Sequence, residues 1–100
     1  MDRLDKTPKG DFFKIVSKNS HKCLDIKRAS TDDGANVQQY SCNGNDNQLF
    51  ILQAQNNAYK IVAKHSGKCL DVKRGSTDDG ANVQQYSCHG NDNQLWFLQK

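Results

Sequence analysis

The chain has 100 residues, of which 35% are apolar, so it is long enough for one small domain with a thin hydrophobic core. Its 14 basic and 11 acidic residues are mixed along the sequence and leave a net charge of +3. Because there is no basic tract and no long apolar run, we expect no nucleic-acid partner and no membrane insertion. Residues 1–5 lack the apolar segment of a signal peptide. We therefore expect an intracellular chain or one whose leader has been removed.

An internal repeat dominates the sequence. Residues 13–53 align without a gap on residues 59–99, and only nine of the 41 aligned positions differ. Both repeats should therefore have the same fold and the same chemistry. On this basis the chain divides into a polar leader (1–11), a first repeat (12–53), a link (54–58) and a second repeat (59–100).

Each repeat is predicted to form four short strands. Apolar and β-branched residues with strand-like spacing indicate strands at 13–17, 23–27, 36–40 and 48–52, and at the equivalent positions of the second repeat. No stretch has a sustained helical period, so the chain is predicted to be all-β.

Turn-forming residues separate these strands. In the first strand connection, Asn19-Ser20-His21 is expected to turn the chain, as is its copy His65-Ser66-Gly67, where the glycine makes the signal clearer. Asp33-Gly34 and residues 43–47 predict two further loops, and Asn56-Asn57 is available for a turn in the link.

Four cysteines in a short polar chain favour a disulfide framework. Because the two repeats should fold alike, the simplest pairing is Cys23 with Cys42 and Cys69 with Cys88. Free thiols are the alternative. Zinc is disfavoured, since the sequence has no C-x2-C motif and no paired histidine spacing. We expect no metal and no cofactor, and the disulfides favour an extracellular or secreted protein.

The repeat resembles one repeat of the ricin-B-type (R-type) lectins, which are β-trefoil carbohydrate-binding modules with a Q-x-W signature. The resemblance rests on the segments Cys-Leu-Asp-Ile/Val, Val-Gln-Gln-Tyr-Ser-Cys and Asn-Gln-Leu-Phe/Trp, which recur in both copies. Gln94-Leu95-Trp96 fits the signature, whereas Gln48-Leu49-Phe50 departs from it by one aromatic exchange.

This resemblance implies one sugar pocket in each repeat. In the family, the aspartate after Cys-Leu accepts hydrogen bonds from adjacent sugar hydroxyls, and the aromatic residue two positions before the second cysteine stacks on the ring. An aromatic face and a carboxylate complement the apolar patch and the vicinal hydroxyls of a sugar. The implied sugar-binding residues are Asp25, Gln38, Tyr40, Asn47 and Gln48 in the first repeat, and Asp71, Gln84, Tyr86, Asn93 and Gln94 in the second.

Each of these side chains also has a purely structural interpretation. The aspartates could be exposed strand charges, the tyrosines half-buried strand aromatics and the asparagines turn residues. Gln48 and Gln94 are expected mainly to support the site by bonding loop backbone.

Three other features receive a structural interpretation. The acidic loop at 30–34 lacks the spaced oxygen ligands of a calcium loop, so a plain turn is favoured. The Lys-Arg pairs at 27–28 and 73–74 are interpreted as solvated strand ends. The histidines do not recur at equivalent positions and are interpreted as surface residues; they are His21, His65 and His89.

The predicted function is that of a multivalent lectin for galactose-like or related sugars. The alternative is a non-sugar β-trefoil interaction or inhibitor protein. An enzyme is not expected, since glycosidases pair two carboxylates across a cleft and each inferred pocket offers one.

The implied fold needs three repeats, and this chain has two. Two repeats would leave strand edges unpaired and the core open. Three chains contribute six repeats, enough for two complete trefoils, so we expect a homotrimer that exchanges strands or repeats between chains. The alternative is a truncated fragment of a longer lectin.

Overall fold

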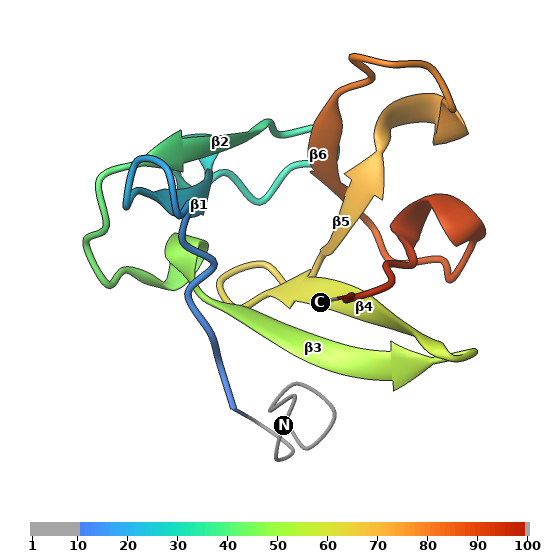
Figure 1. Cartoon of the computed structure of the whole chain (residues 1–100), viewed down its shortest axis with the longest axis horizontal. Helices are drawn as coiled ribbons and strands as arrows, with labels where there is room; N and C mark the ends of the chain where they lie inside the picture. The colour runs from blue at the N-terminus through green and yellow to red at the C-terminus, as the bar shows by residue number, and fades with distance from the viewer. Residues whose placement is uncertain (1–10, 100) are drawn as a thin grey trace.

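The computed structural model describes residues 11–99 and shows an all-β fold (Figure 1). The polar leader, apart from Asp11, lies outside the described residues. In chain order the elements of the described part are β1 (Cys23–Ile26), η2 (Lys27–Ala29), β2 (Val37–Tyr40), η3 (Asp46–Gln48), β3 (Phe50–Gln55), β4 (Ala58–Ala63), β5 (Cys69–Val72), η4 (Lys73–Gly75), β6 (Val83–Tyr86) and η5 (Asp92–Gln94), where η denotes a short 3-10 helix.

Three antiparallel hairpins organise the molecule. β1 pairs with β2 and β5 pairs with β6 in the same register, and both short hairpins lie above the long β3–β4 hairpin in Figure 1. The long hairpin joins the two repeats through Asn56 and Asn57, whose φ angles of 53° and 63° are both left-handed. Two such residues define a tight hairpin turn, so the turn predicted in the link is confirmed.

The predicted strands at the two ends of the chain are shorter than expected. Of residues 13–17, only Phe13 and Val16 form isolated bridges, and the corresponding end of the second repeat has a single bridge from Trp96 to Tyr59. Their equivalents in β3 and β4 pair with each other over six residue positions. Within residues 11–99, the segments at the two ends of the chain have no strand that pairs with them as β3 pairs with β4. This explains why their pairing is irregular. The fourth strand also begins at Phe50, because Gln48 lies in η3.

The hydrophobic core draws on both repeats but is not evenly covered. Ile26, Phe50, Ile61, Ala63 and Leu70 form the buried cluster. Leu70 is buried, whereas its first-repeat equivalent, Leu24, is only partly buried. One side of the core is therefore more open than the other.

Both predicted disulfides are present. Cys23 is bonded to Cys42 and Cys69 to Cys88, so each bond stays within one repeat and joins the start of a strand to the loop after the next strand. Closing a loop of this length stabilises a fold by roughly 3 kcal/mol, which supports a thin core. Disulfides are typical of proteins that fold in an oxidising, extracellular environment. In the part of the chain that the structure describes, no helix is long and apolar enough to cross a membrane.

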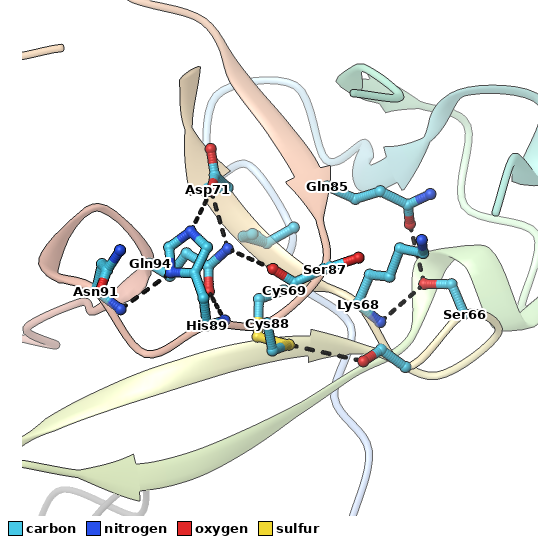
Figure 2. The surroundings of a disulfide bond; sticks show 12 residues. Ser66, Lys68, Cys69, Asp71, Gln85, Ser87, Cys88, His89, Asn91 and Gln94 are labelled. Carbon is cyan, nitrogen blue, oxygen red and sulfur yellow. Dashed lines mark hydrogen bonds and ion pairs between the residues drawn. A yellow bond between two sulfur atoms is a disulfide. The ribbon is translucent and has the colours of Figure 1, made fainter. Parts of the chain in front are cut away.

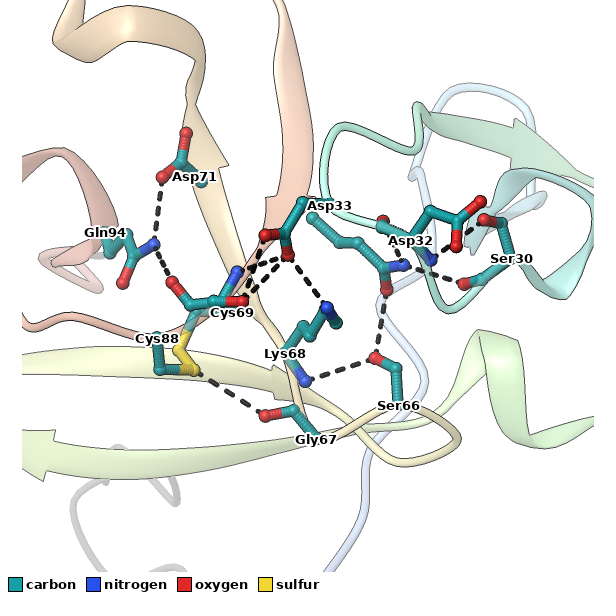
Figure 3. Close-up of polar contacts among 12 residues, drawn as sticks. Ser30, Asp32, Asp33, Ser66, Gly67, Lys68, Cys69, Asp71, Cys88 and Gln94 are labelled. Atoms are coloured by element: carbon teal, nitrogen blue, oxygen red, sulfur yellow. Dashed lines mark hydrogen bonds and ion pairs between the residues drawn. A yellow bond between two sulfur atoms is a disulfide. The ribbon is translucent and has the colours of Figure 1, made fainter.

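A polar contact holds the two repeats together (Figure 3). The Asp33 carboxylate accepts hydrogen bonds from Lys68 Nζ at 2.8 Å and from the backbone N–H and hydroxyl of Ser87 at 2.8 and 2.9 Å. The buried Gln85 donates from Nε2 to the carbonyl oxygens of Ser30 and Asp32, at 2.7 and 2.9 Å. We call this set the inter-repeat contact. It gives the acidic loop a structural role, as a turn that docks on the second repeat.

The inter-repeat contact predicts a pH dependence of stability. The hydrogen bond from Lys68, followed by those from Ser87, lowers the pKa of Asp33. A carboxyl whose pKa is lowered by folding stabilises the fold above its unfolded pKa of about 3.9, and this contribution is lost as pH falls through the lower folded value. Asp33→Asn should therefore melt below the wild type at neutral pH, and the two melting temperatures should converge in acid.

Asp32→Asn is the control for this experiment, since the Asp32 side chain makes no hydrogen bond within residues 11–99. Its melting temperature should follow that of the wild type across the pH range. A difference between Asp33→Asn and the wild type that does not change with pH would show that the ionised carboxylate contributes nothing.

Candidate functional site

Each repeat has a surface pocket at the same place, beside its short hairpin and the 3-10 turn that follows. The two pockets have the same cavity volume of about 480 Å³. The first is lined in part by Asp25, Gln38, Tyr40 and Asn47, and the second by their equivalents Asp71, Gln84, Tyr86 and Asn93. The structure thus brings eight of the ten residues predicted from the sequence into two matching pockets.

The aspartate at the base of each pocket is almost fully buried. Asp25 lies opposite Gln38 in the β1–β2 ladder and is only 3% exposed. Its Oδ1 accepts a hydrogen bond from Gln38 Nε2 at 3.1 Å, and its Oδ2 accepts from Asn47 Nδ2 at 3.3 Å and Gln48 Nε2 at 2.8 Å. The interpretation of this residue as an exposed strand charge is therefore wrong.

The second repeat reproduces this arrangement. Asp71 is 2% exposed and accepts from Gln84 Nε2 at 3.2 Å, Asn93 Nδ2 at 3.2 Å and Gln94 Nε2 at 2.9 Å. In the described part of the chain, neither aspartate forms an ion pair with a lysine or arginine. An ionised carboxylate has about four acceptor positions, so three amide donors leave it able to accept from a ligand hydroxyl.

The signature glutamines lie beneath the pockets and are fully buried. Gln48 Nε2 also donates to the carbonyl oxygen of Ser41 at 2.9 Å, and Gln48 Oε1 accepts from the backbone N–H of Asn43 at 2.8 Å. Gln94 makes the matching bonds to Ser87 and His89, as Figure 2 shows. Both side chains therefore fix the disulfide-bonded loop against the aspartate and support the site, as the sequence predicted.

The two tyrosines are the outward-facing part of each pocket. Tyr40 ends β2 and is 57% exposed, and Tyr86 ends β6 and is 40% exposed. Both are strand residues with part of the ring buried, as the structural interpretation has it, and both also line the pockets. Each ring is accessible to a flat apolar ligand above the buried carboxylate.

The pockets differ where Asn43 is replaced by His89 in the second repeat. His89 Nε2 lies 3.6 Å from Asp71 Oδ2, and its Nδ1 accepts a hydrogen bond from the backbone N–H of Asn91 at 3.0 Å. His89 is exposed, as the sequence predicted, and its ring also contacts the aspartate of the second pocket. His65 differs from the prediction, because it is partly buried and contacts the Ser30 carbonyl at 2.7 Å.

Sequence reasoning also missed the cations at the pockets. Lys27 and Arg28 line the first pocket, and Lys73 and Arg74 line the second. The two arginines have positive φ angles of 58° and 60° within their 3-10 turns, a backbone bend that a strand-end interpretation does not include. The only signal in the sequence was that this pair of residues recurs in both repeats.

The two repeats form a partial β-trefoil. The chain belongs to the ricin-type β-trefoil lectin domain-like family, whose model matches residues 3–86 and, in a second match, residues 53–100. No curated protein matches the chain.

Solved structures agree with this assignment. The chain is similar to ThreeFoil, a designed 3-fold symmetric protein, with 54% identity over 89% of this chain and a TM-score of 0.86. It is also similar to 1,3Gal43A, an exo-β-1,3-galactanase from Clostridium thermocellum, with 40% identity over 92% of this chain and a TM-score of 0.85. It spans 64% of ThreeFoil and 20% of the galactanase, in each case less than two-thirds of the relative.

A Polyporus squamosus lectin has the same fold. Its structure, bound to the epitope Neu5Aca2-6Galb1-4GlcNAc, aligns with a TM-score of 0.80 and 24% identity, over 94% of this chain and 33% of the lectin. At this level of identity the likeness concerns the fold.

Removing a signature glutamine should destabilise the protein strongly. Gln94→Ala deletes a buried side chain and leaves hydrogen-bonding groups of Asp71, Ser87 and His89 without this partner. We expect a loss of about 2–4 kcal/mol in the free energy of unfolding, measured by urea denaturation.

Gln53→Ala is the matched control, because Gln53 is exposed on β3. Its effect should stay within about 0.5 kcal/mol. Equal stability of the two variants would contradict the supporting role of Gln94.

Proposed function

We propose that the protein is a carbohydrate-binding lectin with one sugar pocket in each repeat. The observation that carries the proposal is a buried carboxylate with remaining acceptor capacity beside an exposed tyrosine, present in both repeats. A pyranose ring offers vicinal hydroxyls as donors and a face of C–H groups for stacking. Membership of a lectin domain family supports the same role.

The hydrogen bonds support a separate part for each side chain. Asp25 and Asp71 would accept from two adjacent sugar hydroxyls, while the tyrosine ring stacks on the C–H face. Asn47 Nδ2 already donates to Asp25 and to the Ile26 carbonyl, which leaves its Oδ1 as an acceptor. Asn93 has the same two bonds in the second repeat, to Asp71 and to the Val72 carbonyl.

Galactose-like sugars are the proposed ligand class. The galactanase that is 40% identical to this chain acts on galactan, and this chain matches one-fifth of it. The axial 4-hydroxyl of galactose gathers ring C–H groups on one face, which suits a single stacking tyrosine and a carboxylate at one edge.

Binding without catalysis is part of the proposal. Each pocket offers one aspartate, whereas glycoside hydrolysis needs a second carboxyl group across the bond that is cleaved. An inhibitor or general interaction protein, the other interpretation of the sequence, would not need an exposed tyrosine beside the carboxylate at the same place in both repeats.

We further propose that the lectin is multivalent through a homotrimer. Each pocket is open and offers few contacts, so a single site should bind weakly. Three chains would present six pockets, and linked binding on a multivalent surface raises the apparent affinity by ~10²–10⁴.

The tyrosines provide the cleanest test, because they are the most exposed of the predicted pocket residues. Tyr40→Ala combined with Tyr86→Ala should weaken galactose binding at least ~10-fold in titration calorimetry, since the stacking surface is lost. Tyr40→Ala alone should halve the number of sugar sites per chain and leave the affinity of the second pocket unchanged.

Tyr40→Phe combined with Tyr86→Phe is the control, which keeps the ring and should retain most of the affinity. Melting temperatures should remain close to that of the wild type in all variants. Wild-type binding by the double alanine variant would exclude these pockets as the sugar sites.

A further inference from the structure

We infer that this chain carries, on its two outer faces, the two halves of a second inter-repeat contact, through which a second copy of the chain docks head to tail. This goes beyond sugar binding. This contact would be an interface of the proposed homotrimer. The inference depends on the homotrimer proposal only for the number of chains that assemble.

Both halves of the inter-repeat contact occur twice in the sequence, but among residues 11–99 each repeat uses only one of its two halves. The acidic half of the first repeat, with Asp33, meets the receiving half of the second, with Lys68. The copy of the acidic half contains Asp79, and the copy of the receiving half contains Lys22. Within residues 11–99 the side chains of Asp79 and Lys22 form no ion pair, and both are exposed.

The receiving half of the first repeat is already oriented. Ser20 Oγ donates to Gln39 Oε1 at 2.8 Å, just as Ser66 Oγ donates to Gln85 Oε1 at 3.0 Å. Gln85 is fully buried, because its Nε2 donates into the acidic loop of the first repeat. Gln39 has the same internal bond but is exposed, and its Nε2 has no acceptor in the described part of the chain. It is therefore ready to receive a second acidic loop.

The outer strand edges independently indicate that the second repeat of one chain meets the first repeat of another. In the β3–β4 hairpin, Ile51 lies opposite Val62. Their equivalents at the outer edges are Phe97, which is 72% exposed, and Val16, which is 46% exposed. The same register would place Phe97 of one chain opposite Val16 of a second, so the second repeat of one chain again meets the first repeat of the other.

An apolar groove of about 450 Å³ adds to this surface. It is lined by residues of both repeats, among them Ile15, Leu24, Val37, Trp96 and Leu98. The similar ThreeFoil structure is 3-fold symmetric, and this chain spans 64% of it, so one further repeat of this kind closes such a ring. We expect the first repeat of a second copy to fill this place in the ring, because it can pair with both the loop that contains Asp79 and the strand edge that contains Phe97.

This mode of docking accounts for three chains. The first repeat of a second copy closes the ring. The second repeat of that copy is then displaced, and its β3–β4 hairpin opens at the link. The displaced repeat then completes a second ring with a third copy. Exchange of identical elements between chains is a low-cost route to assembly, because each contact that opens is remade with another copy.

The test is the mass of the 100-residue chain in solution by light scattering at micromolar concentrations. The wild type should have three times the chain mass of 11.3 kDa. Asp79→Lys reverses the charge that faces Lys22 across the interface and should weaken association at least ~10-fold. Its sugar binding should persist, because Asp79 lines neither sugar pocket.

Asp78→Lys is the matched control, with the same charge change one residue away in the same loop. Its first-repeat equivalent, Asp32, contributes only backbone atoms to the inter-repeat contact. This variant should remain trimeric, and circular dichroism should show that both variants are folded.

Carbodiimide cross-linking of mixed isotopically light and heavy chains assigns the contact directly. A linked Asp79–Lys22 peptide pair with one light and one heavy member is expected. A monomeric wild type would overturn both the trimer and this interface. A trimer that Asp79→Lys leaves unchanged, or that lacks the mixed cross-link, would overturn this interface alone.

Discussion

A carboxylate buried without a lysine or arginine partner is the constraint on which each repeat depends. Removing a carboxylate from water costs several kcal/mol unless hydrogen bonds replace its hydration. In both repeats those bonds come from three neutral amides, on the adjacent strand, the 3-10 turn and the signature glutamine. The strand register, the turn and the disulfide-bonded loop must all be correct before the aspartate is satisfied. The fold of the repeat and the shape of its pocket are therefore set by the same interactions.

This arrangement separates residues that build the pocket from those that face a ligand. Gln48 and Gln94 are as conspicuous in the sequence as the aspartates, yet they are fully buried and reach only protein atoms. The tyrosines are the most exposed of the predicted pocket residues. The rim of the pocket can therefore vary, as the exchange of Asn43 for His89 shows, while the internal support stays the same.

Local patterns in the sequence predicted the features that are local in the fold. The strands of the short hairpins, the turn at Asn56-Asn57 and both disulfides are confirmed, because the residues that determine them are close in the sequence. The pocket residues were found through the family resemblance, and the structure places eight of them at two matching pockets. Their role in sugar binding remains a prediction.

Features that depend on distant neighbours could not be read from the sequence. The end strands are irregular because, among residues 11–99, they lack the partner that their equivalents β3 and β4 provide for each other. Asp33 finds Lys68 across 35 positions of the chain, so its loop looked like an isolated turn. His89 looked incidental because only one repeat contains it, although the fold places it beside Asp71.

We propose that the same buried-carboxylate pocket binds sugar in each repeat. A nuclear magnetic resonance titration with galactose can test this by following the side-chain amide signals of Asn47, Asn93, Gln38 and Gln84. We expect the signals of both repeats to shift together and to saturate with similar affinity. Signals that do not move at saturating sugar, or shifts confined to residues outside the two pockets, would contradict it.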